Sequence, residues 1–183
     1  MKAAFLLIIV AIMAGCAITP PINERPETVD EFMNVRTGGN FTDQGAISLF
    51  DADFRFSILL VKDLEWALES IKIPDYRLPY ISRFNRSERV SPFLNFGTFG
   101  REDVDLTYSV KLLGPDGQFA PVEYHDLVIA RSTLYEGMTC PAQEFATMSF
   151  NETDTLGIYQ FYIIIKDNGK VINGCVMQFE LMA

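Results

Sequence analysis

Two apolar runs near the C-terminus constrain the fold of this chain more than any other feature. They cover residues 156–166 and 171–181 and flank residues 167–170, with Asn168 and Gly169 at the centre. Asn-Gly between such runs is the strongest short-range signal for a β-hairpin, because both central turn positions need a positive φ. An isolated hairpin is only marginally stable in water. The sequence therefore predicts a long C-terminal hairpin that belongs to a larger sheet.

The residue pattern within the two runs predicts which faces of the hairpin are covered. The first run is apolar on both faces, so we expect it to lie inside a sheet that is covered on both sides. In the second run side chains alternate, and one face should be buried. That face carries Val171, Asn173, Cys175, Met177, Phe179 and Leu181.

The N-terminus has the features of a secretory signal. Lys2 is followed by a short apolar run at 3–13, too short for a comfortable membrane span. Residues 13–16, Met-Ala-Gly-Cys, resemble the lipobox of bacterial lipoproteins. The resemblance implies that residues 1–15 are removed and that Cys16 is acylated, for example with palmitate, which would hold the protein on a membrane.

An ordinary signal peptide remains the alternative for this segment. It would be cleaved near Ala14 or Gly15 and would leave Cys16 unmodified. If Cys16 is acylated, the following Ala17, in place of Asp, favours the outer membrane by resemblance to proteobacterial sorting rules. We then expect the protein in the bacterial cell envelope, as an outer-membrane lipoprotein that faces the periplasm or the surface.

Composition divides the remaining chain into a tether and one folded domain. Residues 17–30 contain three prolines among polar residues, which is typical of an extended linker. We therefore expect a lipidated cysteine and tether at 16–45 and a single domain at 46–183. The chain is 49% apolar, which excludes general disorder. Its formal charge of −9 would repel phosphate backbones, so no nucleic acid partner is expected.

Several further strands are predicted ahead of the hairpin. Residues 54–61 and 93–99 are apolar runs typical of strands, and 104–112 alternate strictly, with Leu106, Tyr108, Val110 and Leu112 expected to point inward. Residues 114–117, Gly-Pro-Asp-Gly, predict a tight turn, after which one or two strands occupy 118–132.

One short helix is predicted between the first two of these strands. It spans residues 64–70 and is capped by Asp63. Trp66 lies on its flank, and we expect its ring to seal the helix against a sheet rather than to stack on a ligand.

The cysteines suggest a disulfide. With Cys16 assigned to the lipid, Cys140 and Cys175 remain, and an isolated pair in an oxidising compartment usually forms a bridge. The closed loop would stabilise the fold by about 4 kcal/mol on the chain-entropy model. Two separately buried thiols are the alternative.

No residue pattern points to catalysis, a metal or a cofactor. His125 is the one histidine, and the chain lacks the usual hydrolase and zinc motifs. A triad assembled from distant residues around His125 stays possible in principle, although a lone histidine is more often an ordinary residue. Acidic pairs at Asp51, Asp53 and at Asp103, Asp105 fit no calcium-loop template.

Four arginines form the one basic cluster of an acidic chain. Arg77, Arg83, Arg86 and Arg89 could grip a carboxylate, a phosphate or an anionic lipid head, or an acidic partner surface. We favour a solvated loop whose arginines pair with neighbouring acids, because no glycine-rich anion nest lies beside them.

Residues 154–159, Asp-Thr-Leu-Gly-Ile-Tyr, resemble the turn into the penultimate strand of immunoglobulin-like sandwiches. In that turn a glycine makes the corner and a tyrosine hydrogen-bonds back to it. The order of parts at 54–71, 104–117 and 154–181 is similar to a group of small bacterial periplasmic proteins with this sandwich and no assigned activity. The chain departs from true immunoglobulin domains, since it has no cysteine two residues after Tyr159. The resemblance implies an all-β, immunoglobulin-like antiparallel β-sandwich with one short helix, and no mechanism.

Three functional interpretations follow. The first is a lipid-anchored binding module of the cell envelope, without catalytic activity, whose protein partner contacts a sheet edge or the loops at one end. The second is an inhibitor of an extracellular or host hydrolase, such as a protease or a basic lysozyme. The third is a small hydrolase that uses His125.

Overall fold

The computed structural model describes residues 46–50, 53–73, 77–79, 81–99, 103–133 and 139–183. All of them belong to one compact unit that spans Val35–Ala183. The predicted signal peptide, the lipidation of Cys16 and the tether lie outside the described residues, as does Asp51.

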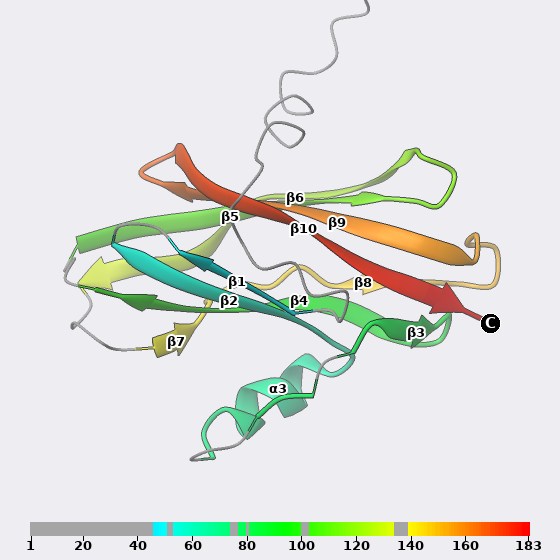
Figure 1. The fold of residues 1–183 in the computed structure, drawn as a ribbon, viewed down its shortest axis with the longest axis horizontal. Coiled ribbons are helices and arrows are strands. Elements are labelled where there is room, and N and C mark those ends of the chain that lie inside the picture. Colours follow the sequence, from blue (N-terminus) through cyan, green and yellow to red (C-terminus); the bar gives the residue numbers. More distant parts are fainter. Residues whose placement is uncertain (1–45, 51–52, 74–76, 80, 100–102, 134–138) are drawn as a thin grey trace, which may run out of the picture. The chain divides into compact units, whose positions relative to one another are not determined.

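The described residues form two facing sheets (Figure 1). The first sheet has the order β1-β2-β4-β7, and β8 also pairs with β4. The second sheet has the order β3-β10-β9-β5-β6. Neighbours are antiparallel, except that β3 and β10 run parallel. The strands of the first sheet are β1 (Ala46–Phe50), β2 (Phe54–Val61), β4 (Arg89–Thr98), β7 (Thr139–Pro141) and β8 (Met148–Ser149), and those of the second are β3 (Arg83–Asn85), β5 (Asp103–Leu113), β6 (Phe119–Thr133), β9 (Gly157–Asp167) and β10 (Lys170–Met182).

The strand order is that of an immunoglobulin-like sandwich. In such folds the first, second and fifth strands share one sheet, while two hairpins lie side by side in the other. Here β2, β4 and β7 are neighbours in one sheet, and the hairpins β5–β6 and β9–β10 meet through β5 and β9 in the other. The predicted fold class, an all-β antiparallel sandwich with one short helix, is confirmed.

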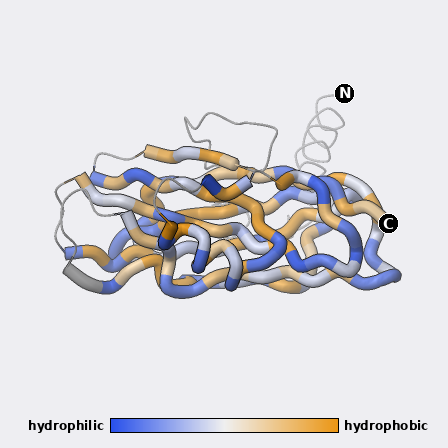
Figure 2. Tube along the Cα trace, turned by 90° about the horizontal axis from the view of Figure 1, so that it is seen from below, coloured by the Kyte–Doolittle hydropathy of each residue, from blue (hydrophilic) through white to orange (hydrophobic). Residues whose placement is uncertain are grey.

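The core lies between the sheets and is rich in aromatic rings. Phe179 is at its centre, with ring centroids of Phe84, Tyr159 and Phe161 at 5.5, 5.5 and 5.2 Å. Offset and edge-to-face pairs at this spacing contribute beyond their buried area. Hydrophobic and hydrophilic residues alternate along the strands (Figure 2), as a sandwich with one wet face per sheet requires.

The C-terminal hairpin is confirmed. β9 and β10 pair along their length, and the turn has Asn168 at φ 48° and Gly169 at φ 75°. The inward face of β10 is buried from Asn173 to Leu181, as predicted. Val171 is only half-buried, because the register shifts between Val171 and Asn173.

The expectation that β9 lies inside a sheet is confirmed, and its expected cover on both sides is confirmed in part. Tyr159, Phe161, Ile163 and Ile165 face the core. On the other face Ile164 is buried, whereas Ile158 is 50% exposed. The described helix, α3 (Leu64–Ser70), packs near β4 of the other sheet, so it does not cover β9 (Figure 1).

The helix α3 begins where the sequence predicts. The backbone N–H of Trp66 donates to Asp63 Oδ1 at 2.9 Å, which caps the first turn. Ala67 and Ser70 are buried, and Ala67 joins a second small core with Phe93. Trp66 itself is 41% exposed, so the sealing role expected for its ring falls to smaller side chains. No helix in the described part of the chain could span a membrane.

Candidate functional site

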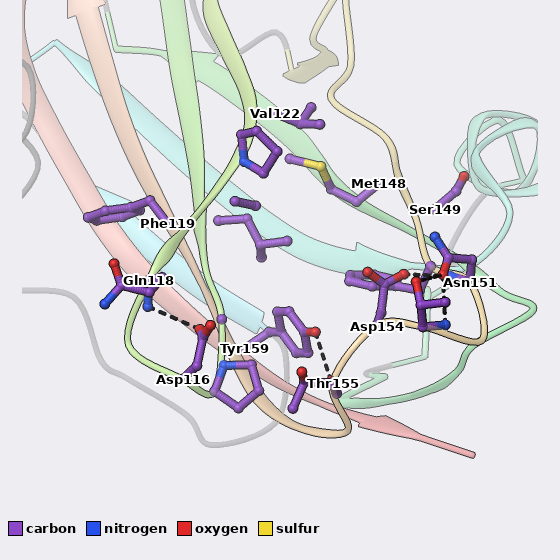
Figure 3. A pocket seen from close by; sticks show the side chains of 17 residues that line it. Asp116, Gln118, Phe119, Val122, Met148, Ser149, Asn151, Asp154, Thr155 and Tyr159 are labelled. Atoms are coloured by element: carbon purple, nitrogen blue, oxygen red, sulfur yellow. Dashed lines mark hydrogen bonds between the residues drawn. The ribbon is translucent and has the colours of Figure 1, made fainter.

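A cleft of about 450 Å³ opens at one end of the sandwich (Figure 3). It lies between the turn that joins β5 to β6, the first residues of β6, and the segment that runs from β8 to the start of β9. Ligand sites in proteins are concave, of this size, and lined by apolar groups with a few polar ones. In sandwiches the loops at one end commonly carry binding.

The floor of the cleft is apolar and rigidly packed. Leu112, Met148 and Tyr159 are 2%, 5% and 6% exposed and belong to the main core. The ring of Phe150 packs on Tyr159 with centroids 5.1 Å apart. Val122 on β6 stands at the mouth with 48% of its surface exposed. An apolar group that enters the cleft would therefore pack against apolar side chains and aromatic rings at the bottom.

One rim is the predicted turn at 114–117. Gly117 adopts φ 76°, and its N–H donates to the Gly114 carbonyl at 3.1 Å. Asp116 Oδ1 accepts from the backbone N–H of Gln118 at 3.1 Å. These bonds hold the Asp116 carboxylate at the edge of the cleft.

The opposite rim is a closed turn at residues 151–154. The N–H of Asn151 donates to Asp154 Oδ2 at 2.5 Å, and Thr153 N–H donates to Asn151 Oδ1 at 2.8 Å. Arg86 lies in the turn between β3 and β4, and its Nη2 donates to the Asp154 carbonyl at 2.5 Å. The Asp154 side chain is thereby fixed at the second rim.

The corner that the sequence resemblance implies joins the two rims. Tyr159 Oη donates to the Thr155 carbonyl at 2.8 Å, which confirms the tyrosine corner. Gly157 adopts φ 136°, and a Cβ built there would lie 3.1 Å from Pro115 Cβ. Only glycine suits both this conformation and this close approach.

The cleft is acidic. Its lining includes Asp116 and Asp154, and no lysine, arginine or histidine. The pKa of Tyr159 is raised, first by burial and then by the charges of Asp154 and Asp116, while Arg86 acts in the opposite direction. Both carboxylates thus act on the same ring, from the two rims.

Two tyrosines of the second sheet position the segment before β8, and sequence reasoning missed this role. Tyr108 Oη donates to the Glu144 carbonyl at 3.0 Å and accepts from the Ala146 N–H at 3.1 Å. Tyr124 Oη donates to the Thr147 carbonyl at 2.6 Å. These bonds set the place of Met148 in the floor. The alternation at 104–112 correctly predicted that Tyr108 points inward, but it contains no signal for its partner.

The arginine cluster is partly used by the fold. Arg83 Nε lies 3.1 Å from Glu180 Oε2, and Arg86 holds the Asp154 carbonyl. The predicted pairing with an acid is confirmed for Arg83, which lies in β3, whereas Arg86 binds a backbone carbonyl instead of a carboxylate. Arg77 and Arg89 are exposed.

The predicted Cys140–Cys175 disulfide is wrong, since both are free thiols. Cys140 lies on β7 of the first sheet, paired with Phe96, whereas Cys175 lies on β10 of the second, paired with Ile163. Cys175 packs in the core and Cys140 is half-buried against it. Burial raises the pKa of the Cys175 thiol to about 12. The alternative of two separate thiols is the arrangement observed.

His125 lies on β6 and is half exposed. Its Nε2 is 3.0 Å from Glu123 Oε2, and Glu123 Oε1 in turn lies 2.9 Å from Lys111 Nζ. Asp105 pairs with Arg131 at 3.0 Å. Within the described ranges no three His, Cys, Asp or Glu side chains gather as metal ligands would.

Comparisons with known proteins identify no family. No family model matches the chain, and no curated protein does. A Niemann-Pick type C2 protein from the Japanese carpenter ant is 8% identical, with 81% of this chain and 95% of that chain covered and a TM-score of 0.38.

Two bacterial structures show similarly distant likenesses. An alkylpurine DNA glycosylase of Pseudomonas fluorescens is 15% identical over 56% of this chain, with a TM-score of 0.37, and the match spans only 28% of that enzyme. An immunoglobulin-like protein of Pseudomonas aeruginosa is 13% identical over 59% of this chain and 84% of that chain, with a TM-score of 0.28. An immunoglobulin-like fold is compatible with a binding module, and fold alone assigns no activity.

Proposed function

We propose that this protein is a lipid-anchored binding module of the bacterial cell envelope, without catalytic activity, whose protein partner docks at the cleft. The cleft carries the proposal, because it joins an apolar floor to a polar rim on a rigid scaffold. The lipobox-like segment at Cys16 supports the anchor, and the proline-containing stretch after it suits a tether.

The free sheet edge of β6 supports docking less well than the cleft does. Sheet edges recruit added strands through unpaired backbone groups, and proteins blunt them with proline, charges and bulges. β6 carries all three: Pro121 has no N–H to donate, Glu123 and Asp126 are exposed acids, and its pairing with β5 shifts register three times. Asp126 also has a positive φ of 49°.

Site-specific photocrosslinking tests the docking site. A photoreactive residue at Val122, at the mouth of the cleft, is compared in cells with one at Ile73, which is equally apolar and 56% exposed. We expect a discrete protein adduct from position 122 and none from position 73. Equal adducts from both positions, or none from 122, would contradict the proposal.

Membrane fractionation tests the anchor separately. The wild-type protein should sediment with membranes, and Cys16→Ser should release it into the soluble fraction. A Cys16→Ser protein that still sediments would contradict lipid anchoring without affecting the docking site.

The two remaining interpretations are distinguished by activity. If the protein is an inhibitor, the partner in the adduct should be a hydrolase, and the purified protein at micromolar concentration should slow that hydrolase's reaction. If the protein is a hydrolase, His125→Ala should abolish its activity. If it is a binding module, the His125→Ala variant should still give the adduct at position 122. The geometry favours the hydrolase least, because Glu123 is the hydrogen-bond partner of His125 among the described residues.

A further inference from the structure

We infer that the cleft binds a peptide segment of the partner in which a basic side chain stands next to an apolar one. This inference rests on the proposed function, since it names the ligand class of the same cleft. It follows from the charge of the lining, from the free carboxylate oxygens and from the apolar floor between them.

The charge of the lining selects a cation. Seventeen residues line the cleft, and the charged ones among them are Asp116 and Asp154. The formal charge of the chain is −9. Arg86, which binds the Asp154 carbonyl but does not line the cleft, offsets part of the charge of the two carboxylates. A complementary potential steers the encounter and excludes acidic competitors.

The two carboxylates keep acceptor capacity for an added donor. Asp116 uses Oδ1 for Gln118 N–H, and Asp154 uses Oδ2 for Asn151 N–H. Among the described residues, the second oxygen of each has no hydrogen-bond partner. Figure 3 shows the Tyr159 side chain between the two aspartates, so an ammonium or guanidinium group above that ring could reach either rim.

The apolar floor favours a peptide as the carrier of that cation. Leu112, Met148 and Tyr159 offer a buried apolar surface for a neighbouring side chain. A protein partner can present a cationic and an apolar side chain next to each other on one peptide segment, so a peptide can occupy the rims and the floor together.

Fluorescence anisotropy with synthetic peptides tests the inference on the full-length protein in detergent. The probe is a labelled peptide of alternating Leu and Lys, and its partner has Glu in place of each Lys. We expect the Lys peptide to bind and to weaken as salt rises, because screening reduces the attraction. The Glu peptide should bind at least about tenfold more weakly.

The variants separate the cleft charge from the charge of the whole chain. Asp116→Asn with Asp154→Asn keeps the oxygens that accept the backbone bonds, and should weaken the Lys peptide about tenfold. The matched control is Asp103→Asn with Asp105→Asn, which removes the same charge at the other end of β5 and should leave affinity unchanged. Val122→Lys, at an exposed position, should weaken the peptide as well and does not depend on either rim folding normally.

Two results would overturn the inference. One is equal binding of the Lys and Glu peptides. The other is equal affinity for the cleft and control double variants. If either occurs while position 122 still gives its adduct, the ligand class is wrong and the docking site stands. If position 122 gives no adduct, the proposed function itself fails.

Discussion

Lys111 has the least expected environment of any residue in this protein. It belongs to the polar side of the alternating strand, yet its side chain is buried, with 3% of its surface exposed. Its neighbours on that face are buried too, Thr107 at 7% and Ser109 at 1% exposure. β5 lies between β6 and β9, so side chains of both strands close over it. Its Nζ lies 2.9 Å from Glu123 Oε1 and 5.9 Å from the centre of the Phe119 ring. A buried ammonium is tolerated only when paired in this way.

The pair should respond unequally to the loss of each partner. Glu123→Gln replaces the carboxylate that faces the buried Lys111 ammonium with a neutral amide, and should lower the free energy of unfolding by about 1–3 kcal/mol. The value should lie toward the lower end, because Glu123 is partly open to solvent. Lys111→Met removes the buried charge and should cost less. Urea unfolding measures both, and a larger loss for Lys111→Met would contradict the pairing.

The same pair predicts a pH dependence. The hydrogen bond from Lys111 is the largest factor that acts on the pKa of Glu123, which is lowered from its ordinary 4.5. A lowered folded pKa means that the stabilisation is complete above pH 4.5 and is lost as the pH falls below it. The difference in unfolding free energy between wild type and Glu123→Gln should therefore shrink below pH 4.5. A difference that stays constant down to pH 3 would show that the ion pair contributes nothing.

At the scale of elements, two glycines near the ends of β9 serve the fold in different ways. Gly169 in the β9–β10 turn has φ 75°, and a Cβ there would meet no atom within 4 Å. Gly157 has φ 136°, and a Cβ there would press on Pro115 of the β5–β6 turn. The first glycine serves the hairpin alone, whereas the second couples two turns that form the cleft.

Alanine substitutions should reveal this difference. Gly169→Ala should cost about 1 kcal/mol, since a left-handed residue without a clash is only mildly unfavourable. Gly157→Ala should cost about 2 kcal/mol or more, because strain and overlap add. It should also weaken the Lys peptide, whereas Gly169→Ala should not. Thermal unfolding and anisotropy together test this, and equal effects of the two variants would argue against the coupling of the turns.

At the scale of the whole molecule, the two cysteines lie in different sheets and are not bonded to each other. Cys175 lies on an inner strand of the second sheet and is 3% exposed, and Cys140 lies on the short β7 at the edge of the first sheet. Short edge strands open locally at lower free energy than core strands do. The two thiols should therefore report different events.

Thiol labelling of the native protein checks this. A thiol-specific reagent should modify Cys140 first, and Cys175 only on global unfolding, because burial both shields its sulfur and raises its pKa to about 12. Peptide mass mapping assigns the sites. In the denatured protein the reagent should label both cysteines without a reductant. If it does not, the result would support the Cys140–Cys175 disulfide.

Much of the fold follows from local pattern. Asn168 and Gly169 predicted the hairpin turn, residues 114–117 predicted the turn that became one rim of the cleft, and Tyr159 predicted the corner. Each of these depends on backbone conformation within a few residues, which a sequence displays directly. The cleft itself was not predicted, because Met148 and Asp154 reach it only through contacts with Tyr108, Tyr124 and Arg86, residues distant in the chain.

The sequence by itself determined the β class, the hairpins and their inward faces, since turn chemistry and period-two alternation are local properties. Tertiary structure alone decided that Trp66 and Ile158 are exposed, that Lys111 is buried, that Cys140 and Cys175 stay unbonded, and that two aspartates meet across an apolar floor. These outcomes depend on which strands become neighbours and on what covers each sheet. A side chain's own sequence context contains no record of either.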